Sequence, residues 1–364
     1  MDSASRVPPL PSERLVALRI IDANRNRATE GLRVVEDYCR FGLNDAHLTE
    51  RIKRLRHDLT SALAVLDPQE LAAARQTETD VGTSIATPQE QSRDSLAQIA
   101  AASWQRVQQA LRVIEEHLKL FSPAAAAQVE ALRYQSYTLA KACRTTADSH
   151  TRLACAKLYV LIDGGPSECA FAERVQDLIA AGVQVLQLRD NQLDDRALLS
   201  RARLLRRVLD NTTTHHSPLT TLFILNDRPD IALLARADGV HVGQEELSVH
   251  DVRQIVGPNL LVGVSTHTIE QARQAVLDGA NYLGCGPTFP SGTKHFDRFP
   301  GLEFLRQVAA EISLPAFAIG GITLENLSQV RANGFTRVAV GGLIATSSDP
   351  GQMAALLGRM VESS

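Results

Sequence analysis

The sequence lacks any uninterrupted apolar run of the roughly 18 residues that a membrane-spanning helix needs. Its N-terminus has prolines at Pro8, Pro9 and Pro11, where a signal peptide would have an apolar core. Cysteine is also scarce: the five cysteines are widely scattered and form no CxxC pair, which argues against a disulfide framework and against a zinc site. We therefore expect a protein of the reducing cytoplasm with no membrane partner.

An excess of charge of either sign is absent too. The chain has 38 basic and 41 acidic residues, a net charge of −3, whereas diffuse binders of nucleic acid are usually more basic. We therefore expect no nucleic-acid partner. With 44% apolar and 22% charged residues, the composition is that of a soluble globular protein and excludes a disordered, collagen-like or coiled-coil chain. The 364 residues suggest about two domains.

Residues 15 to about 148 lack the alternation of β-strands and have the periodicity of helices. Apolar residues recur at spacings of four, three and four, as in Ala28, Leu32, Val35 and Cys39. We therefore predict an all-α N-terminal domain, with a loop around residues 68–95.

This helical half also contains a repeat. RATEGLRVVED at residues 27–37 is matched 79 residues later by RVQQALRVIEE at residues 106–116, which predicts two helical hairpins from an internal duplication. Two interpretations of its arginines stay open: they gather on an anion, or they pair with glutamates nearby on the helices. The arginines concerned are Arg27, Arg33, Arg56 and Arg112.

After residue 156 short apolar runs alternate with segments of helical length. The runs span 157–163, 183–190, 221–227, 239–243, 261–266, 282–286, 315–321 and 337–342. Eight strands, each followed by a helix, predict a (β/α)8 TIM barrel, with a doubly wound open sheet as the alternative. A polar stretch at 145–156 marks the boundary, so we predict domains at 1–150 and 151–364.

Unusual polar residues and glycines follow the predicted strands, where the active sites of such barrels lie. The pairs Gly320-Gly321 and Gly341-Gly342 follow strands seven and eight. Barrels commonly bind phosphate there, because backbone N–H groups can approach its oxygens when no Cβ intervenes. Tight turns are the alternative explanation. The Ser/Thr-rich run that ends in Lys294 adds hydroxyl groups and a cation.

Two acidic residues, Asp227 and Glu246, follow strands three and four. Beside Arg189 and Lys294 they predict Mg²⁺ bridged to a polyphosphate, since Mg²⁺ prefers carboxylates, phosphate oxygens and water. A salt-bridge network at the barrel rim is the alternative. We assign no catalytic role to His267, and we predict that His241, inside strand four, is a packed histidine with a hydrogen-bond partner.

These residues, taken in order along the chain, resemble the thiamine-phosphate synthase family. The matching motifs are Gln187-x-Arg189, Asn226-Asp227, Asp238 to Glu246, Gly263 to His267, Gly286 to Lys294 and Gly320 to Ile322. The resemblance covers about residues 156–350. It implies a transferase of thiamine biosynthesis that joins an aminopyrimidine diphosphate to a thiazole phosphate and releases pyrophosphate, with Mg²⁺ as cofactor.

The resemblance also implies roles for individual residues. The pyrimidine diphosphate would be bound by Gln187, Leu188, Arg189, Asp190, Asn191 and Asn226. The Mg²⁺ ion would be held by Asp227 and Glu246. The expected catalytic residues are Arg189, Ser265 and Lys294, of which Ser265 and Lys294 would contact the pyrimidine or its diphosphate. The thiazole phosphate would be bound by Ser291, Gly292, Thr293, Gly321, Gly341 and Gly342.

The sequence departs from the family at two of these positions. Asn191 stands where lysine is usual and removes a positive charge from the diphosphate site, and Glu246 stands where aspartate is usual. No Ser-His-Asp or Cys-His arrangement is evident. This agrees with a reaction in which the electron-rich pyrimidine supports a cation and the protein stabilises the leaving diphosphate electrostatically.

Two other functions remain as alternatives: an isomerase similar to thiazole tautomerases, which needs no diphosphate site, and a non-catalytic sensor of thiamine intermediates. A homo-oligomer is compatible with the sequence. The helical half resembles a module fused ahead of such synthases, most clearly at Ile21 to Arg27. That resemblance implies phosphorylation of hydroxymethylpyrimidine phosphate. No Walker-type loop is present, and Asp80 to Thr83 is a candidate phosphate contact.

Overall fold

The structure is a computed structural model that describes residues 11–75, 92–212, 221–290 and 300–362. It divides the chain into two compact units, Met1–Arg144 and Thr145–Ser364. Residues 145–152 of the predicted polar boundary are helical, because α5 (Pro123–Arg152) continues into the second unit. Among the described residues, no helix is both long enough and apolar enough to cross a membrane.

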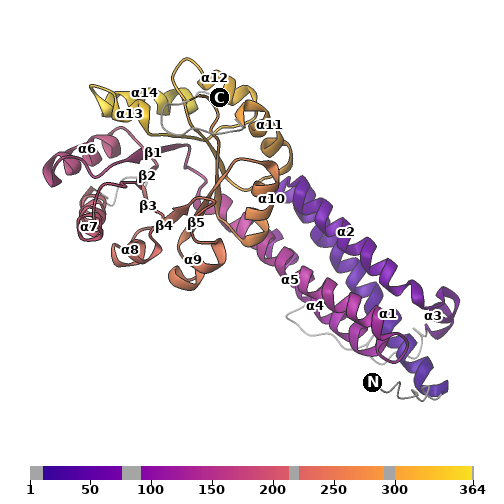
Figure 1. The fold of residues 1–364 in the computed structure, drawn as a ribbon. Coiled ribbons are helices and arrows are strands. Elements are labelled where there is room, and N and C mark those ends of the chain that lie inside the picture. Colours follow the sequence, from indigo (N-terminus) through magenta and orange to yellow (C-terminus); the bar gives the residue numbers. More distant parts are fainter. Residues whose placement is uncertain (1–10, 76–91, 213–220, 291–299, 363–364) are drawn as a thin grey trace. The chain divides into compact units, whose positions relative to one another are not determined.

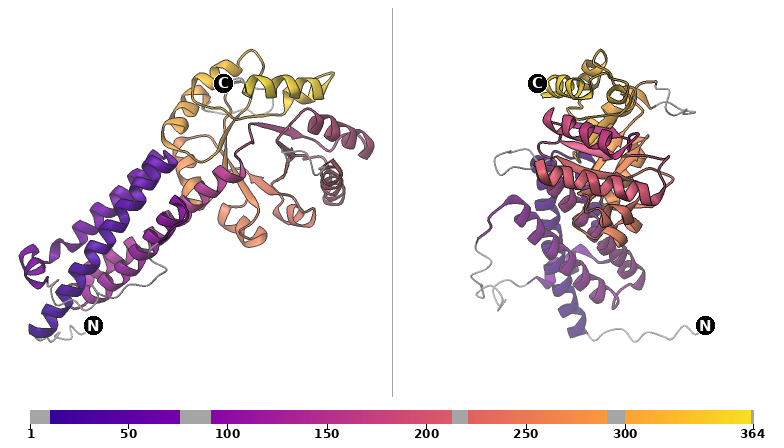
Figure 2. Two further views of the ribbon diagram at one scale, coloured as in Figure 1. Left: turned by 180° about the vertical axis from the view of Figure 1, so that it is seen from behind. Right: turned by 90° about the vertical axis from the view of Figure 1, so that its left-hand side faces the viewer.

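The second unit is a closed barrel of eight parallel strands, in which β1 pairs with both β2 and β8. The strands are β1 (Leu158–Ile162), β2 (Val185–Leu188), β3 (Leu222–Asn226), β4 (Gly239–Val242), β5 (Leu261–Thr266), β6 (Tyr282–Cys285), β7 (Ala316–Ile319) and β8 (Val338–Val340). Figures 1 and 2 show the helices outside the strands. The predicted barrel is thereby confirmed, and the doubly wound alternative is wrong.

The helices of this unit follow the strands in turn. They are α6 (Glu168–Ala180), α7 (Asp195–Thr212), α8 (Pro229–Leu234), α9 (Val249–Val256), α10 (Ile269–Asp278), α11 (Gly301–Glu311), α12 (Leu327–Ala332), α13 (Gly342–Ala345) and α14 (Pro350–Glu362). Serine or threonine side chains cap α6, α9 and α10 by accepting a hydrogen bond from a backbone N–H of the first turn. These caps begin the helices directly after the loops that form the barrel mouth.

Three aromatic rings fill the centre of the barrel. Tyr159, Tyr282 and Phe317 are almost fully buried, and their ring centroids lie 5.2 to 5.9 Å apart. Glycine makes room for them on the neighbouring strand, since a Cβ at Gly263 would overlap the phenol ring of Tyr282. Successive side chains of a strand point to opposite faces, so the residue two positions further along each of these strands also points inward. That residue lies closer to the barrel mouth.

In the first unit, the described residues form helices and short connections and no strand, with two long hairpins. Its elements are α1 (Pro11–Asp37), a π-helical turn η1 (Tyr38–Leu43), α2 (Ala46–Ala62), a 3-10 turn η2 (Leu63–Val65), α3 (Pro68–Ala74), α4 (Leu96–Leu118) and the start of α5. All five cysteines of the chain are free thiols, and Cys39 and Cys143 bring their sulfur atoms within 3.3 Å in this unit. This agrees with the prediction of no disulfide framework.

The repeat-related segments make the same contact in each hairpin. Glu36 of α1 pairs with Arg56 of α2 at 3.2 Å, and Glu115 of α4 pairs with Arg133 of α5 at 2.8 Å. Arg112 also pairs with Glu115, at 2.6 Å. Pairing with glutamate is therefore the correct interpretation for Arg56 and Arg112.

Candidate active site

A chain of hydrogen bonds crosses the barrel interior below the mouth. The Nε2 of Gln187 on β2 donates to the Tyr159 hydroxyl at 2.8 Å, and that hydroxyl lies 3.1 Å from the Tyr282 hydroxyl. His241 on β4 continues the chain: its Nδ1 is 3.3 Å from Tyr282 and its Nε2 is 2.9 Å from the Oγ of Ser265 on β5. The two predicted substrate-binding residues at its ends, Gln187 and Ser265, are therefore connected through side chains on five strands.

Burial keeps the titratable side chains in this chain of hydrogen bonds uncharged. Burial, and next the positive charge of Arg189, lower the pKa of His241 to about 4, so its imidazole is neutral at pH 7. Burial raises the pKa of Tyr159 and of Tyr282, so both phenols stay protonated. His241 is thus a packed histidine with hydrogen-bond partners, as the sequence predicts.

One acceptor atom in this chain of hydrogen bonds has no partner among the described residues. The Oε1 of Gln187 is buried and accepts no hydrogen bond in the described part of the protein, although the amide of the same side chain is fixed by Tyr159. An unsatisfied buried acceptor costs about 1–3 kcal/mol. A ligand that supplies an N–H or O–H donor at the end of β2 would recover that free energy.

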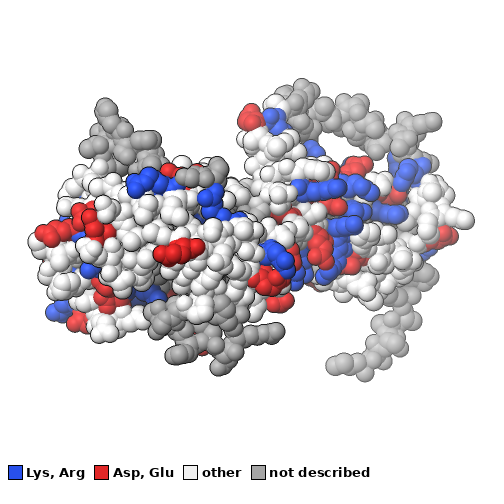
Figure 3. Space-filling model, turned by 90° about the horizontal axis from the view of Figure 1, so that it is seen from above, with Lys and Arg blue, Asp and Glu red and all other residues white. Residues whose placement is uncertain are grey.

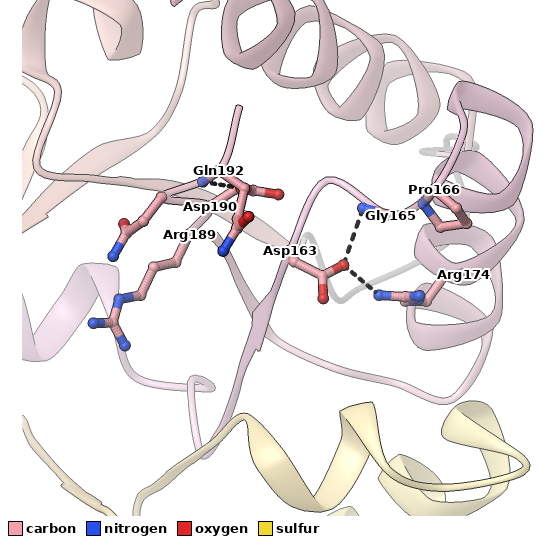
Figure 4. Close-up of a pocket in the computed structure, with 8 residues that line it drawn as sticks. Asp163, Gly165, Pro166, Arg174, Arg189, Asp190 and Gln192 are labelled. Atoms are coloured by element: carbon pink, nitrogen blue, oxygen red, sulfur yellow. Dashed lines mark hydrogen bonds and ion pairs between the residues drawn. The ribbon is translucent and has the colours of Figure 1, made fainter. Parts of the chain in front are cut away.

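A hollow of about 580 Å³ opens beside β1 and β2, and Arg189, Asp190 and Asn191 contribute to its lining. Figure 4 shows the Arg189 side chain extending away from Arg174 on α6. Arg174 pairs with Asp163 at 2.8 Å, while Arg189 makes no ion pair with any residue in the described ranges. Arg189 therefore has its positive charge available for a ligand.

Asp190 plays a different part from its neighbours. Its carboxylate accepts three backbone hydrogen bonds, from Gly164 at 2.9 Å, Gln192 at 2.7 Å and Leu193 at 3.1 Å. Burial opposes ionisation, but these donors and Arg201 outweigh it and lower the pKa of Asp190. Its side chain thus joins the loops after β1 and β2 rather than pointing a free carboxylate at a ligand.

Asp227 and Glu246 lie at the ends of the paired strands β3 and β4. Asp227 has a left-handed backbone, with φ of 60°, and its N–H donates to the carbonyl of His241 at 2.8 Å. Asn226 donates its amide to the Asp227 carboxylate. The Glu246 carboxylate folds back over Gly243, where a Cβ would collide with it.

These two carboxylates fit a magnesium ion in kind and number. Mg²⁺ takes one or two protein carboxylates and completes its shell with substrate oxygens and water. No group of three or more His, Cys, Asp or Glu able to hold a metal occurs within the described ranges.

The ends of β7 and β8 carry the predicted glycine pairs. Gly320 and Gly321 have φ of 95° and 65°, a conformation that disfavours other residues. A Cβ at Gly321 would come within 2.7 Å of the Phe289 carbonyl, whereas the space beside Gly342 is open. Ser291, Gly292, Thr293 and Lys294 lie outside the described residues, as does Asp80 to Thr83 in the first unit.

With this geometry in place, comparison with known proteins identifies the relatives. The family model described as thiamine monophosphate synthase matches residues 158–344, and the ThiD2 family model matches residues 19–142. A thiamine-phosphate synthase of Rhodopirellula baltica is 48% identical, with 92% of this chain and 90% of that protein covered. One of Gloeobacter violaceus is 42% identical, with 94% and 96% covered. The chain belongs to the thiamine-phosphate synthase family.

A solved structure supports the same assignment for the barrel. Thiamine phosphate pyrophosphorylase from Pyrococcus furiosus is 30% identical, with a TM-score of 0.50, over 57% of this chain and 96% of that one. The function is therefore that of a thiamine-phosphate synthase, a transferase of thiamine biosynthesis. The isomerase and sensor alternatives are set aside.

Of the predicted ligand-binding residues that the structure describes, Asp190 has its carboxylate taken up by backbone N–H groups, and Leu188 differs as well. Leu188 is completely buried, and because Gln187 faces the interior, the Leu188 side chain faces the helices; only its backbone is near the mouth. His267, to which the sequence assigns no catalytic role, contacts the Gly286 carbonyl through its ring and so joins the ends of β5 and β6.

The sequence does not indicate that Tyr159 and Tyr282 contact the predicted site residue Gln187 and His241 inside the barrel. Both are hydroxyl-bearing residues inside otherwise apolar strands, a signal that by itself does not reveal which face they occupy. Their shared contact with Gln187 and His241 depends on strand register, which pairs Tyr159 with Val185 and Gly263 with Tyr282. That register is a property of the closed barrel.

Proposed function

We propose that the barrel mouth binds the pyrimidine diphosphate at the ends of β2, β3 and β4, and the thiazole phosphate at the ends of β7 and β8. The observation that carries this assignment is the unpartnered Oε1 of Gln187. The amino group of the pyrimidine is an N–H donor of the kind this oxygen requires. Arg189 and Asn191 line the adjoining hollow, where the diphosphate would extend.

At the other end, Gly321, Gly341 and Gly342 would present backbone N–H groups to the thiazole phosphate, together with Ser291, Gly292 and Thr293. The left-handed backbone at Gly321 and the open space beside Gly342 support this role. The phosphorylated pyrimidine and thiazole are the partners that the site requires.

Asp227, with Asn226 donating to it, and Glu246 would hold Mg²⁺. When bound, the ion would supply positive charge to offset the diphosphate as it leaves. Arg189 and Lys294 add charge of the same sign, and both are proposed to act on the leaving group electrostatically.

The remaining work is positioning. Gln187, whose amide is held by the Tyr159 hydroxyl, would accept a hydrogen bond from the pyrimidine, and Ser265, held by neutral His241, would contact it from β5. The diphosphate departs with the bonding electron pair and leaves a cation at the methylene carbon, which the electron-rich pyrimidine supports. The thiazole nitrogen then attacks that carbon, so no protein nucleophile is required. Holding both substrates in this geometry provides much of the rate enhancement.

The assignment of the two ends is tested by titrating each substrate separately into the wild-type protein and into Asp227→Asn, with Mg²⁺ present. We expect the variant to lose affinity for the pyrimidine diphosphate and turnover, and to bind the thiazole phosphate normally. Loss of thiazole-phosphate binding with the diphosphate bound normally would reverse the assignment.

A second activity is proposed for the helical unit: phosphorylation of the pyrimidine monophosphate to the diphosphate at the expense of ATP. The match of residues 19–142 to the ThiD2 family supports it. The full chain would then form thiamine phosphate from the pyrimidine monophosphate, ATP and thiazole phosphate. If no diphosphate forms while the supplied diphosphate is still consumed, this second activity is wrong and the synthase stands.

A further inference from the structure

A second hollow, of about 670 Å³, lies in the helical unit between α1 and α4. Its ten lining residues form five pairs, and the members of each pair are 79 positions apart in the chain. Arg27 corresponds in this way to Arg106, Glu30 to Gln109, and Gly31 to Ala110. Equivalent positions of the two repeats therefore line the same hollow, one set on α1 and the other on α4.

Burial follows the same pairing. Gly31 and Ala110 are both buried, and Arg27 and Arg106 are both exposed. The helices approach closely at the buried position, where a Cβ on Gly31 would come within 2.7 Å of Val107. Since equivalent positions of the two helices line one hollow, Arg27 belongs to its α1 side and Arg106 to its α4 side.

The arginines of this unit differ in their partners. Arg56, Arg112 and Arg133 all pair with glutamates, whereas Arg27 and Arg106 form no ion pair with any residue in the described ranges. Figure 3 shows Lys and Arg side chains, with Asp and Glu side chains among them, on the face of the helical unit turned toward the viewer. Two guanidinium groups that share a hollow repel each other until an anion lies between them, and guanidinium forms paired hydrogen bonds with phosphate oxygens.

The hollow also has room for more than phosphate. Its volume falls in the range of small-molecule sites, roughly 300–1,000 Å³. Glu30 is its single acidic lining residue, and Gln109 stands at the equivalent place. The two sides of the hollow therefore differ in charge at this position. A ligand with an N–H or O–H donor would place that donor at Glu30.

We propose that this hollow is a binding site for a small phosphate monoester, with its phosphate held jointly by Arg27 and Arg106 and a hydrogen-bond donor of its organic part held by Glu30. The proposal deepens the second activity proposed above by giving its substrate a location. Binding requires no ATP and no phosphoryl transfer, so the two proposals can fail separately.

The test uses the full chain, which has a single tryptophan. Trp104 is buried on α4 beside the lining residue Ser103, so its emission reports on this unit rather than on the barrel. The probe is the pyrimidine monophosphate without ATP, followed both by Trp104 emission and by equilibrium dialysis of the labelled compound. Arg27→Ala, Arg106→Ala and, as the matched control, Arg33→Ala are compared with the wild type; Arg33 is exposed on the same helix and does not line the hollow.

We expect Arg27→Ala and Arg106→Ala each to weaken binding at least tenfold, Arg27→Lys to weaken it less, and Arg33→Ala and the synthase turnover to stay unchanged. Equal binding by all variants would overturn the proposal. Inorganic phosphate that binds as tightly as the monoester would overturn the role given to Glu30. If the monophosphate binds but is not phosphorylated after ATP is added, the binding site is supported and the proposed kinase activity is wrong.

Discussion

The Nε2 of His241 lies 2.9 Å from the Oγ of Ser265, at the point where the buried hydrogen-bond chain reaches the barrel mouth. Ser265 is partly exposed and His241 is buried. The imidazole thus fixes a hydroxyl that a substrate can contact, while being withdrawn from the substrate itself.

Replacing His241 with glutamine removes the ring that orients Ser265. We expect kcat/KM for the pyrimidine diphosphate to fall about tenfold, the effect of about 1.4 kcal/mol at the transition state. Binding of the thiazole phosphate should be unaltered, because its proposed site is at other strands. A larger effect on thiazole phosphate than on the diphosphate would contradict the positioning role.

The lowered pKa of His241 predicts a dependence of stability on pH. The unfolded chain binds a proton near the ordinary pKa of 6.5 and the folded barrel binds it only near 4. Unfolding is therefore accompanied by proton uptake between these values, and the free energy of unfolding falls as the pH is lowered from about 6.5 to about 4, by on the order of 3 kcal/mol. Urea denaturation of the barrel at pH 7 and 4.5 measures the loss, which should be smaller in His241→Gln.

Asn191 offers a test of the diphosphate site by added charge. Asn191→Lys should tighten binding of the pyrimidine diphosphate, most strongly at low ionic strength, because a partly exposed charge is screened by salt. Gln352→Lys adds the same charge at an exposed position of α14 and serves as the control. A Michaelis constant that does not change with salt in Asn191→Lys would place this residue away from the diphosphate.

Gly263→Ala tests the packing that supports the hydrogen-bond chain. The new Cβ would overlap the Tyr282 ring, so the ring must move away from Tyr159 and His241. Overpacking of this kind costs about 1–3 kcal/mol. Chemical denaturation should show that loss together with reduced turnover, while Gly351→Ala on α14, where the added Cβ meets only ordinary contacts, should change neither.

The sequence predicts the barrel because each strand carries its own apolar run, and it predicts the glycine pairs because left-handed backbone at Gly320 and Gly321 leaves a local mark. It could not show that the Asp190 carboxylate is taken up by backbone N–H groups of two loops. The partnering of Tyr159 with Tyr282 spans 123 positions and follows from barrel closure. Nor does the sequence show that Arg106 of α4 lines the same hollow as Arg27 of α1, because this depends on how the two helices pack.

Residues just before position 151 contact the barrel. The polar stretch at 145–156 predicts a start at residue 151, but Ser149 is fully buried and accepts a hydrogen bond from Asn281 at 3.1 Å. His150 lies 2.8 Å from the Ser313 hydroxyl. A fragment of residues 151–364 removes both partners and leaves the buried Asn281 amide unsatisfied, at a cost of about 1–3 kcal/mol. A fragment of residues 145–364 keeps them.

Both fragments should catalyse synthase turnover, since the strand ends are intact in each. The fragment that begins at residue 145 should melt several degrees higher, because a difference of about 1 kcal/mol shifts the melting temperature of a barrel of this size by about 2–4 °C. Ser149→Ala in the longer fragment should account for part of the difference, whereas Thr151→Ala, at an exposed position two residues on, should not. Equal melting temperatures for the two fragments would show that residues 145–150 add nothing to the barrel and that the boundary at 151 is the correct one.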